Sequence, residues 1–406
     1  MNVAPVRTNW TIVLLMALGF GLVGIDRFMI TTLFPVIAKD LDLDYGDIGT
    51  ISGSLAFAWA LAALVMGNRA DRIGRGTVLA GALFVFALLI GASGLATGLA
   101  GLVLVRVLMG FADGAYTPGS IAATLQAAAP RHHGLAIGIQ QMMLPLFGLG
   151  FVPLAMAGLL EVVTWRWAFV VFAIPGFVLA ALVWRILPRA PTQPSRSHGS
   201  FQDWRTTLRF RNVRVAMLLM LCWLTCLMTT SALLPNYLID HLGLPFSQMS
   251  GVMSAVGIGS AVGTLVLAWL SDRMGRKAVV LLSSVGAIVS LVMLASTDAQ
   301  PLRLFVCLFC VHFFNNAAIT LTVGPVCAEA VPPSLMATAS GLVIAVGEVF
   351  GGGFAPVIAG QMAQRFGIEH LLLLPIGALA LGFLLSLLLT ETARGASVPV
   401  TESNSS

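Results

Sequence analysis

Charged side chains are scarce in this chain. Only 10% of its 406 residues are Asp, Glu, Lys or Arg, whereas 58% are hydrophobic. An ordinary soluble domain carries about a quarter charged residues, and the mean hydropathy here is +0.95. The composition therefore excludes a typical soluble protein and predicts an integral membrane protein.

Signatures of catalysis are also missing. The sequence contains no metal-ligand cluster, no nucleophile with a positioned base and no glycine-rich phosphate loop, so we expect neither an enzyme nor a bound metal or cofactor. Cys307 and Cys310 have C-x-x-C spacing, but in an apolar helix free cysteines pack as small hydrophobic residues. All five cysteines lie in the second half: Cys222, Cys226, Cys307, Cys310 and Cys327.

Apolar stretches long enough to cross a bilayer, roughly 20 residues each, recur twelve times. They predict an all-α membrane protein with twelve transmembrane helices arranged as two pseudo-symmetric six-helix bundles. The predicted spans are 10–38, 48–67, 77–97, 101–127, 134–160, 167–187, 213–239, 248–270, 277–297, 301–329, 336–362 and 369–390.

One long polar segment, residues 188–212, interrupts this pattern. It predicts a cytoplasmic linker between an N-terminal bundle, 1–187, and a C-terminal bundle, 213–391, with a disordered cytoplasmic tail at 392–406. The first apolar stretch is too long for the core of a cleaved signal peptide and lacks a small-residue cleavage site, so we expect it to remain as a helix.

Basic residues cluster on one side of the membrane when the loops are assigned alternately to the two sides. Sixteen of the 22 Lys and Arg residues fall on the side that holds both termini and the linker, which predicts that these are cytoplasmic. The net charge of +5 reflects this topology, so nucleic acid is not an expected partner. We expect a monomer in the inner membrane, with the lipid bilayer as its surroundings.

A D-R-x-G-R motif occurs twice, starting at Asp71 and at Asp272, 201 residues apart. The same motif at equivalent places in the two halves predicts duplication of one six-helix unit. In each copy a glycine turn joins two helices, and the arginines can anchor to headgroups and carbonyls.

This loop is the signature of the major facilitator superfamily, which the chain resembles over residues 10–390. The resemblance implies alternating access between the two bundles, with substrate bound at the midplane. It also implies a conformational or gating role for the residues of both loops: Gly67, Asp71, Arg72, Arg75, Asp272, Arg273 and Arg276.

Four ionisable side chains lie inside predicted spans: Asp26, Arg27, Arg106 and Asp113. Each costs roughly 2.5 to 3.5 kcal/mol at the centre of a bilayer on insertion scales. Such residues generally serve transport, so we expect them to form the functional site. One alternative is that they form structural ion pairs between the first and fourth spans; another is that Arg27 and Asp113 are functional and the other two structural.

The segments around these charges give a narrower resemblance. Ile25-Asp26-Arg27, the run from Arg106 to Gly119, and Trp165-Arg166-Trp167-Ala168-Phe169 are similar to the anion:cation symporter group, which includes transporters of sugar acids and other organic anions. The chain departs from that group in having Asp113 in place of Glu and no aromatic residue just before Asp26. The run Gly347–Gly353 resembles other organic-acid carriers.

The spacing of the charges suggests how they act. Arg106 and Asp113, seven residues apart, share a helix face and are expected to line a cavity. Asp26 and Arg27 are adjacent, so one faces the cavity and the other a neighbouring helix. Two arginines and two ionised aspartates sum to zero. Protonation of one aspartate would free a guanidinium for a carboxylate, so proton and anion binding would favour each other.

The second half has no equivalent charges, since the 201-residue offset maps Asp26, Arg106 and Asp113 onto Leu227, Cys307 and Phe314. We expect its neutral polar residues to bind the rest of the substrate. The predicted substrate ligands are Arg27, Arg106, Gln140, Gln141, Asn236, Tyr237, His312, Asn315 and Asn316, and the predicted proton-coupling residues are Asp26, Asp113 and Glu348.

Three of these assignments have structural alternatives. Gln140 and Gln141 can serve as hydrogen-bonding contacts between helices. His312 can be a buried, hydrogen-bonded core histidine, and Glu348 can pair with a neighbouring helix.

These observations predict proton-coupled uptake of a small organic anion, such as a sugar acid or a hydroxy or aromatic acid. The alternatives are a proton-driven exporter and a non-transporting sensor. Gly148, Gly150, Pro153 and Gly158 match an antiporter motif only in part, which favours import. Both tails are short, which disfavours a sensor.

Overall fold

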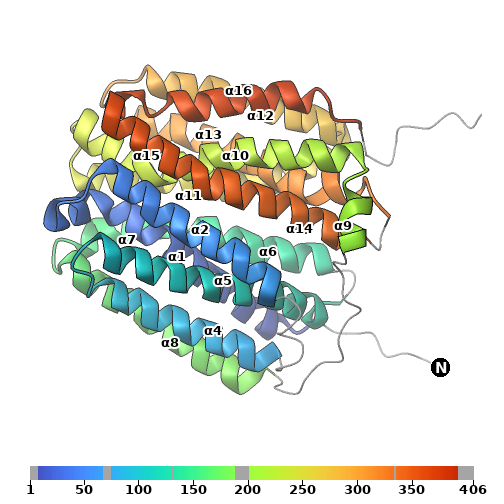
Figure 1. Ribbon diagram of the computed structural model, residues 1–406, viewed down its shortest axis with the longest axis horizontal. Helices are drawn as coiled ribbons and strands as arrows, with labels where there is room; N and C mark the ends of the chain where they lie inside the picture. Colours follow the sequence, from blue (N-terminus) through green and yellow to red (C-terminus); the bar gives the residue numbers. More distant parts are fainter. Residues whose placement is uncertain (1–7, 67–74, 130–131, 188–200, 333–334, 392–406) are drawn as a thin grey trace, which may run out of the picture.

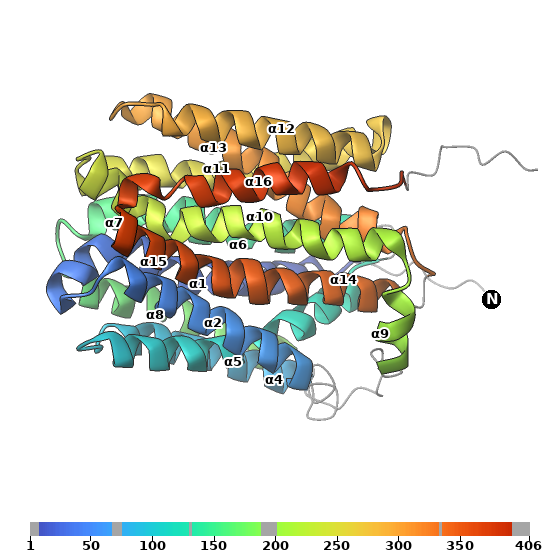
Figure 2. The same ribbon diagram turned by 45° about the horizontal axis from the view of Figure 1, so that its top comes forward.

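The computed structural model describes residues 8–66, 75–129, 132–187, 201–332 and 335–391. Within these ranges the chain is helical and contains no strand. Figure 1 shows long helices running side by side, and Figure 2 shows them in two groups, with the first half of the sequence below the second.

The first group follows the predicted order of six spans. Its helices are α1 (Trp10–Leu41), α2 (Tyr45–Met66), α4 (Arg75–Ser93), α5 (Leu99–Ala127), the continuous run α6 (His133–Pro145), η2 (Leu146–Phe151) and α7 (Val152–Leu159), and α8 (Trp165–Ile186).

The second group repeats this order. It consists of α10 (Arg211–Asn236) with η3 (Tyr237–His241), α11 (Phe246–Met274), α12 (Arg276–Ala295), α13 (Pro301–Leu321) with η4 (Thr322–Val326), α14 (Met336–Val346) with η6 (Gly347–Phe354) and α15 (Ala355–Phe366), and η7 (Ile368–His370) with α16 (Leu373–Ser386).

The predicted spans are confirmed, since each predicted start lies within three residues of the first residue of a helix. Among the described residues, eleven segments are long and apolar enough to cross a membrane, and α2 is the twelfth long helix. The stretch 188–212 was predicted as a polar linker, but it holds a short helix, α9 (Phe201–Thr207), and the first residues of α10. The predicted tail at 392–406 lies outside the described residues.

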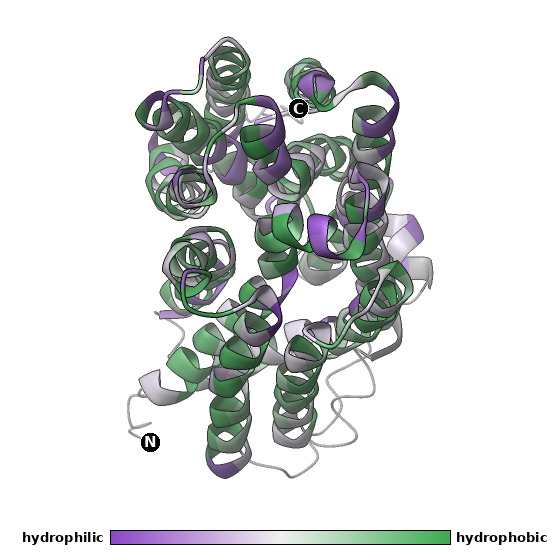
Figure 3. Ribbon diagram, turned by 90° about the vertical axis from the view of Figure 1, so that its left-hand side faces the viewer, coloured by the Kyte–Doolittle hydropathy of each residue, from purple (hydrophilic) through white to green (hydrophobic). Residues whose placement is uncertain are grey.

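Apolar side chains cover the outside of the bundle. Phe84, Leu104, Ile174, Leu265 and Leu381 are each at least half exposed, and Figure 3, seen along the helices, shows apolar colouring on most of the bundle and hydrophilic colouring near the loops. An apolar surface of this extent suits hydrocarbon and not water. The backbone N–H and C=O groups form hydrogen bonds within the helices, as the interior of a membrane requires.

The internal repeat is visible in the backbone as well as in the sequence. The π-helical segments η2 and η6 interrupt corresponding helices, and Gly347, where η6 begins, lies 201 residues after Leu146, where η2 begins. Each is followed two residues later by a proline, Pro153 or Pro356. Proline removes a backbone donor and displaces the preceding turn, which is a common cause of such a bulge.

The two halves meet along a seam of glycines near the end of the bundle where α1 joins α2. A Cβ atom on Gly49 would lie 2.5 Å from the Pro356 carbonyl oxygen, and one on Gly360 would lie 2.3 Å from the Tyr45 carbonyl oxygen. Without side chains at these positions, the backbones of α2 and α15 can touch. The Tyr45 hydroxyl also donates to Asp240 at 3.0 Å across the seam.

Replacing Gly49 with Val should force α2 and α15 apart, because the new side chain has no space beside Pro356 and Val357. Spin labels on Lys39 and Gln364, which are exposed at this end of the two halves, should report a longer distance by pulsed electron paramagnetic resonance. Gly251→Val is the control, since no atom lies within 4 Å of a Cβ there. An unchanged distance in Gly49→Val would contradict the close approach.

Candidate functional site

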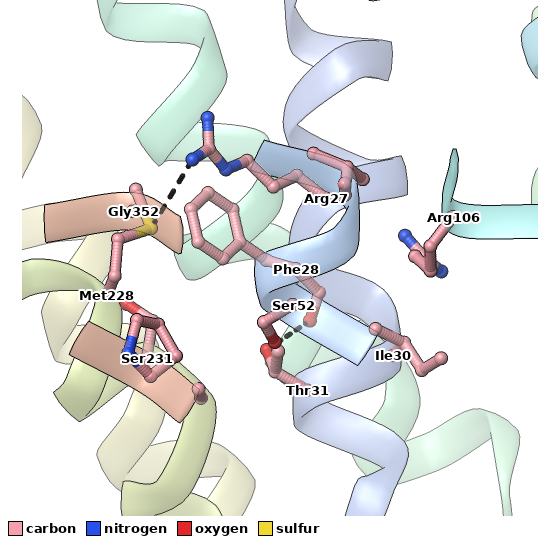
Figure 4. Close-up of a pocket in the computed structure, with 12 residues that line it drawn as sticks. Arg27, Phe28, Ile30, Thr31, Ser52, Arg106, Met228, Ser231 and Gly352 are labelled. Atoms are coloured by element: carbon pink, nitrogen blue, oxygen red, sulfur yellow. Dashed lines mark hydrogen bonds between the residues drawn. The ribbon is translucent and has the colours of Figure 1, made fainter. Parts of the chain in front are cut away.

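A small cavity lies between the two halves at the middle of the bundle. Figure 4 shows that α1 passes through the site, with Arg27 on one side and Arg106 on the other. The cavity combines two guanidinium groups with hydroxyl and apolar side chains. Its lining residues are Arg27, Phe28, Ile30, Thr31, Ser52, Leu55, Arg106, Met228, Ser231, Ala232, Gly352 and Pro356.

The internal symmetry explains which residues of the second half reach the cavity. Arg27, Ile30 and Thr31 on α1 lie 201 residues before Met228, Ser231 and Ala232 on α10, and all six line the cavity. The Arg27 Nη2 atom contacts the Met228 Sδ atom at 3.5 Å. Equivalent helices of the two repeats therefore face one another across the site.

Arg27 forms an ion pair with Glu348 that joins the two halves. Its Nη2 atom lies 2.6 Å from Oε2 of Glu348, and its Nη1 atom lies 3.4 Å from Oε1. The two side chains are only 7% and 10% exposed. A fork of this kind is the strongest common pairing of a guanidinium with a carboxylate.

Two further features fix the position of the Arg27 guanidinium. It lies over the ring of Trp59, with 4.7 Å between the guanidinium carbon and the ring centroid, a favourable cation–π contact. A Cβ on Gly352 would lie 2.7 Å from the Glu348 Oε2 atom and 3.5 Å from the Arg27 Nη2 atom. The absence of a side chain at position 352 therefore leaves space for the ion pair.

Asp26 faces the opposite way and packs against α5. The Arg106 Nη1 atom donates to the Asp26 backbone carbonyl at 2.6 Å and lies 3.7 Å from the Asp26 Oδ1 atom. Both side chains are almost fully buried. The structure thus decides the orientation that the sequence left open: Arg27 faces the second half, and Asp26 faces the first.

Asp113 was expected to line the cavity beside Arg106, but it is not among the lining residues. It is completely buried, and neither of its carboxylate oxygens accepts a hydrogen bond from a described residue; nor do those of Asp26. The Nε and Nη2 groups of Arg106 likewise donate no hydrogen bond to a described residue. Buried polar groups without partners are costly. A proton on one carboxyl group, or a hydrogen bond from water, would lower this cost.

Glu348 changes the charge balance that the sequence suggested. Asp26, Asp113 and Glu348, if all ionised, outnumber Arg27 and Arg106 by one. The expectation of a neutral site with four ionised groups was therefore wrong, because it left out a carboxylate that reaches the site from the second half. With these five groups, one carboxylate must hold a proton for the site to be neutral.

The two adjacent glutamines have different surroundings. Gln140 is fully buried, accepts a hydrogen bond from Thr124 at 2.6 Å and donates one to Ser120 at 2.9 Å. It therefore connects α6 to α5. Gln141 is exposed. Neither lines the cavity.

The neutral polar residues predicted in the second half lie elsewhere and make contacts within that half. His312 lies 3.3 Å from the Thr230 hydroxyl, Asn315 donates to the Trp223 carbonyl at 3.1 Å, and Asn316 donates to Thr264 at 3.0 Å. Asn236 donates to Asp240 at 3.2 Å, and the Tyr237 ring packs against His241. The cavity lining includes none of the five predicted residues.

Two serines that the sequence analysis did not select line the cavity instead. The hydroxyl oxygens of Ser52 on α2 and Ser231 on α10 are buried and have no hydrogen-bond partner among the described residues. Serine is common in membrane helices, so residue type alone gave no signal. The 201-residue offset from Ile30 would have placed Ser231 on the cavity face once α1 was known to line it.

The second copy of the loop motif forms a charged network at the other end of the bundle. Arg276 pairs with Asp272 at 2.5 Å and with Glu329 at 3.0 Å, and Arg273 lies over the Trp269 ring. The backbone N–H groups of Arg276 and Lys277 donate to Glu391.

The first copy of the loop motif is described only in part. Gly67, Asp71 and Arg72 lie outside the described residues, and Arg75 begins α4 without a described side chain. The gating role of both loops stays a prediction.

Two helical bundles that enclose a charged midplane cavity define a class of protein, the multi-pass membrane transporters. The family model of the Major Facilitator Superfamily matches residues 16–349 and, in a second match, 229–405. The chain belongs to this superfamily. Its fold and its relatives are those of transporters and not of enzymes.

Known proteins resemble the chain along most of its length. A 3-(3-hydroxy-phenyl)propionate transporter of Escherichia coli is 30% identical over 80% of this chain and 80% of its own length. The sialic acid transporter NanX of the same organism is 28% identical over 86% of each. A bacterial homolog of the human lysosomal transporter Spinster, solved in an inward-facing and unoccupied conformation, has the same fold, with a TM-score of 0.77 at 18% identity over 96% of this chain and 98% of its own.

Gln140→Ala should lower the stability of the protein, because it removes two buried hydrogen bonds between α5 and α6 and leaves Thr124 and Ser120 without that partner. The expected loss is about 1 to 3 kcal/mol, measured by thermal unfolding in detergent. Gln141→Ala is the matched control and should change stability by less than about 0.5 kcal/mol. Equal effects of the two substitutions would contradict this role of Gln140.

Proposed function

We propose that this protein is a secondary active transporter that takes up a small organic anion together with a proton. The observation that carries the proposal is the cavity between the two halves, where two buried guanidinium groups lie among hydroxyl and apolar side chains. Guanidinium groups bind carboxylates in bidentate fashion. The apolar lining suits a substrate with a hydrocarbon or aromatic body next to its acid group.

Arg27 is the proposed carboxylate-binding residue. It faces the cavity and lies between the two bundles, so a substrate bound to it would contact both halves. Arg106 holds the Asp26 backbone carbonyl and lines the other side of the cavity. Ser52 and Ser231 have free hydroxyl groups that can bind a second polar group of the substrate.

Asp113 is the proposed proton carrier, with Asp26 beside Arg106 as its partner in the same buried cluster. Burial favours the neutral form of a carboxyl group, and a nearby arginine favours the ionised form. A carboxyl group under both influences can bind and release a proton during a transport cycle. Its protonation adds one positive charge to the site and so favours binding of an anion.

The named relatives support an acidic substrate. Propionate derivatives and sialic acids are both carboxylic acids, and the two transporters named for them resemble the chain along most of its length. We also propose that the protein acts as a monomer in the inner membrane, with both termini and the linker in the cytoplasm, because basic residues concentrate on that side.

The direct test is internal pH in proteoliposomes that carry a trapped dye, with 3-(3-hydroxyphenyl)propionate, a sialic acid, a hexuronate or lactate added outside. Acidification with one acid would support symport and name the substrate class. Internal alkalinisation would support export by exchange with protons. A folded protein that responds to none of these acids would contradict the proposal.

Asp113→Asn should abolish proton-driven accumulation of the anion and leave exchange of internal for external anion intact. The amide is uncharged and cannot release a proton, so the site stays in the form that binds the anion. Accumulation and exchange of labelled anion are measured in the same proteoliposomes. Normal accumulation by Asp113→Asn would place the proton carrier elsewhere.

Arg27→Gln should weaken anion binding, because it removes the bidentate charged contact. A hydrogen bond to a charged group contributes about 1.5 to 3 kcal/mol, so Kd should rise by more than about tenfold, as measured by titration calorimetry. Arg276→Gln, in the network with Asp272 and Glu329, is the control and should keep the wild-type Kd. An unchanged Kd in Arg27→Gln would exclude Arg27 as the carboxylate ligand.

A further inference from the structure

We propose that Glu348 is an internal ligand of Arg27: its carboxylate occupies the place of a substrate carboxylate, and the substrate replaces it once Glu348 has bound a proton. The inference deepens the proposed function and rests on it. It assigns to Glu348 a role distinct from that of Asp113, which carries a proton without contacting the cavity.

Glu348 binds Arg27 with the geometry that a free carboxylate ligand would use. Glu348 approaches the guanidinium with both oxygens, at 2.6 and 3.4 Å, as a free carboxylate would. Arg27 lines the cavity, and so does Gly352, one helical turn after Glu348. The pair therefore lies at the edge of the cavity, where a substrate carboxylate could replace that of Glu348.

The contact joins two parts of the chain that must separate in alternating access. Arg27 belongs to α1 and Glu348 to η6, in opposite halves. A buried guanidinium deprived of its partner is costly, so the empty protein keeps the pair closed. A substrate carboxylate supplies the same interaction to Arg27 without the covalent connection to the second half.

A proton on Glu348 would remove the charge that holds this carboxyl group to Arg27. Arg27 is the ion-pair partner that the structure records for Glu348, and Asp26, Asp113 and Arg106 lie beyond it on α1 and α5. Of the elements packed against η6, α2 has its nearest described acidic or basic side chain at Asp47, five residues before Ser52 of the cavity. On α10 the nearest is Arg214, 14 residues before Met228. On the same helix as η6, α14 has none and α15 has only Arg365, at its far end.

The exchange balances in atoms and charge. The one proton that Asp113 carries passes to a carboxylate oxygen of Glu348, so that Asp113 is ionised again and Glu348 is neutral. The two contacts of Glu348 to Arg27 are then replaced by those of the substrate carboxylate. One proton and one monoanion enter together, so the net charge of the cavity is the same before and after. Binding and protonation are then linked, and affinity should fall by about tenfold for each pH unit above the pKa of the group that binds the proton.

Chemical rescue tests the internal ligand without any need for the true substrate. In Glu348→Ala the Arg27 guanidinium lacks its partner, so acetate should bind there and raise the unfolding temperature in a saturable way. The wild type should not respond to acetate, and acetamide, which is uncharged, should have no effect on either protein. The double variant Arg27→Gln, Glu348→Ala is the control and should not respond to acetate.

Two results would overturn the inference: a folded Glu348→Ala protein that does not respond to acetate, or an equal response in the double variant. A response to acetate combined with no proton movement in the proteoliposome assay would leave Glu348 as an internal ligand of Arg27, but it would refute both symport and the proton as the trigger of the exchange. Symport without the acetate response would support symport and refute the role of Glu348 as an internal ligand. The two proposals therefore fail in different ways.

Glu348→Gln supplies a second test if the alanine variant does not fold. The amide keeps the size of the side chain but does not compete as an anion. It should bind 3-(3-hydroxyphenyl)propionate at least about tenfold more tightly than the wild type at pH 8, and with a weaker dependence on pH. Glu329→Gln, which alters an acid paired with Arg276 far from the cavity, should keep the wild-type dependence. The same pH dependence in Glu348→Gln and wild type would refute the role of Glu348.

Discussion

The buried guanidinium of Arg27 imposes the main constraint on this structure. A positive charge at the centre of an apolar bundle needs an anion, and the first half directs its own aspartate, Asp26, away from it toward Arg106. The anion therefore comes from the second half, through Glu348. The site depends on both halves being in contact at this point, so its electrostatics change whenever the halves move.

The contact between the two halves also requires glycine, because residues without side chains let the two backbones approach closely. Gly352 leaves space beside the ion pair, and the neighbouring Gly353 packs against Gly53, next to Ser52 of the cavity. The seam and the site are thus adjacent turns of the same two helices. A movement that opens the seam would also move the wall of the cavity, which connects access to binding in a direct mechanical way.

Most of the fold could be predicted from the sequence, since long apolar stretches report directly on membrane spans and the repeated loop motif reports on duplication. The helix starts at Trp10, Pro301 and Met336 agree with the predicted residues. The short helix α9 was missed, because seven residues in a polar segment give little periodicity. Arg27, Arg106 and Asp26 were found because a charge inside a span is a strong signal.

The second-half residues that line the cavity could not be predicted by residue type, because polarity alone does not say which way a side chain faces. His312 and Asn315 are more polar than Ser231 and Met228, yet they bond within their own half, whereas the latter two line the cavity. Orientation follows instead from the internal symmetry, which sets Met228 opposite Arg27. The duplication makes the helices of the two halves equivalent, but the charged residues of the site are distributed unequally between them. Arg27 has Met228 and not a charged residue as its symmetric counterpart, so its ion-pair partner Glu348 comes from a different helix of the second half.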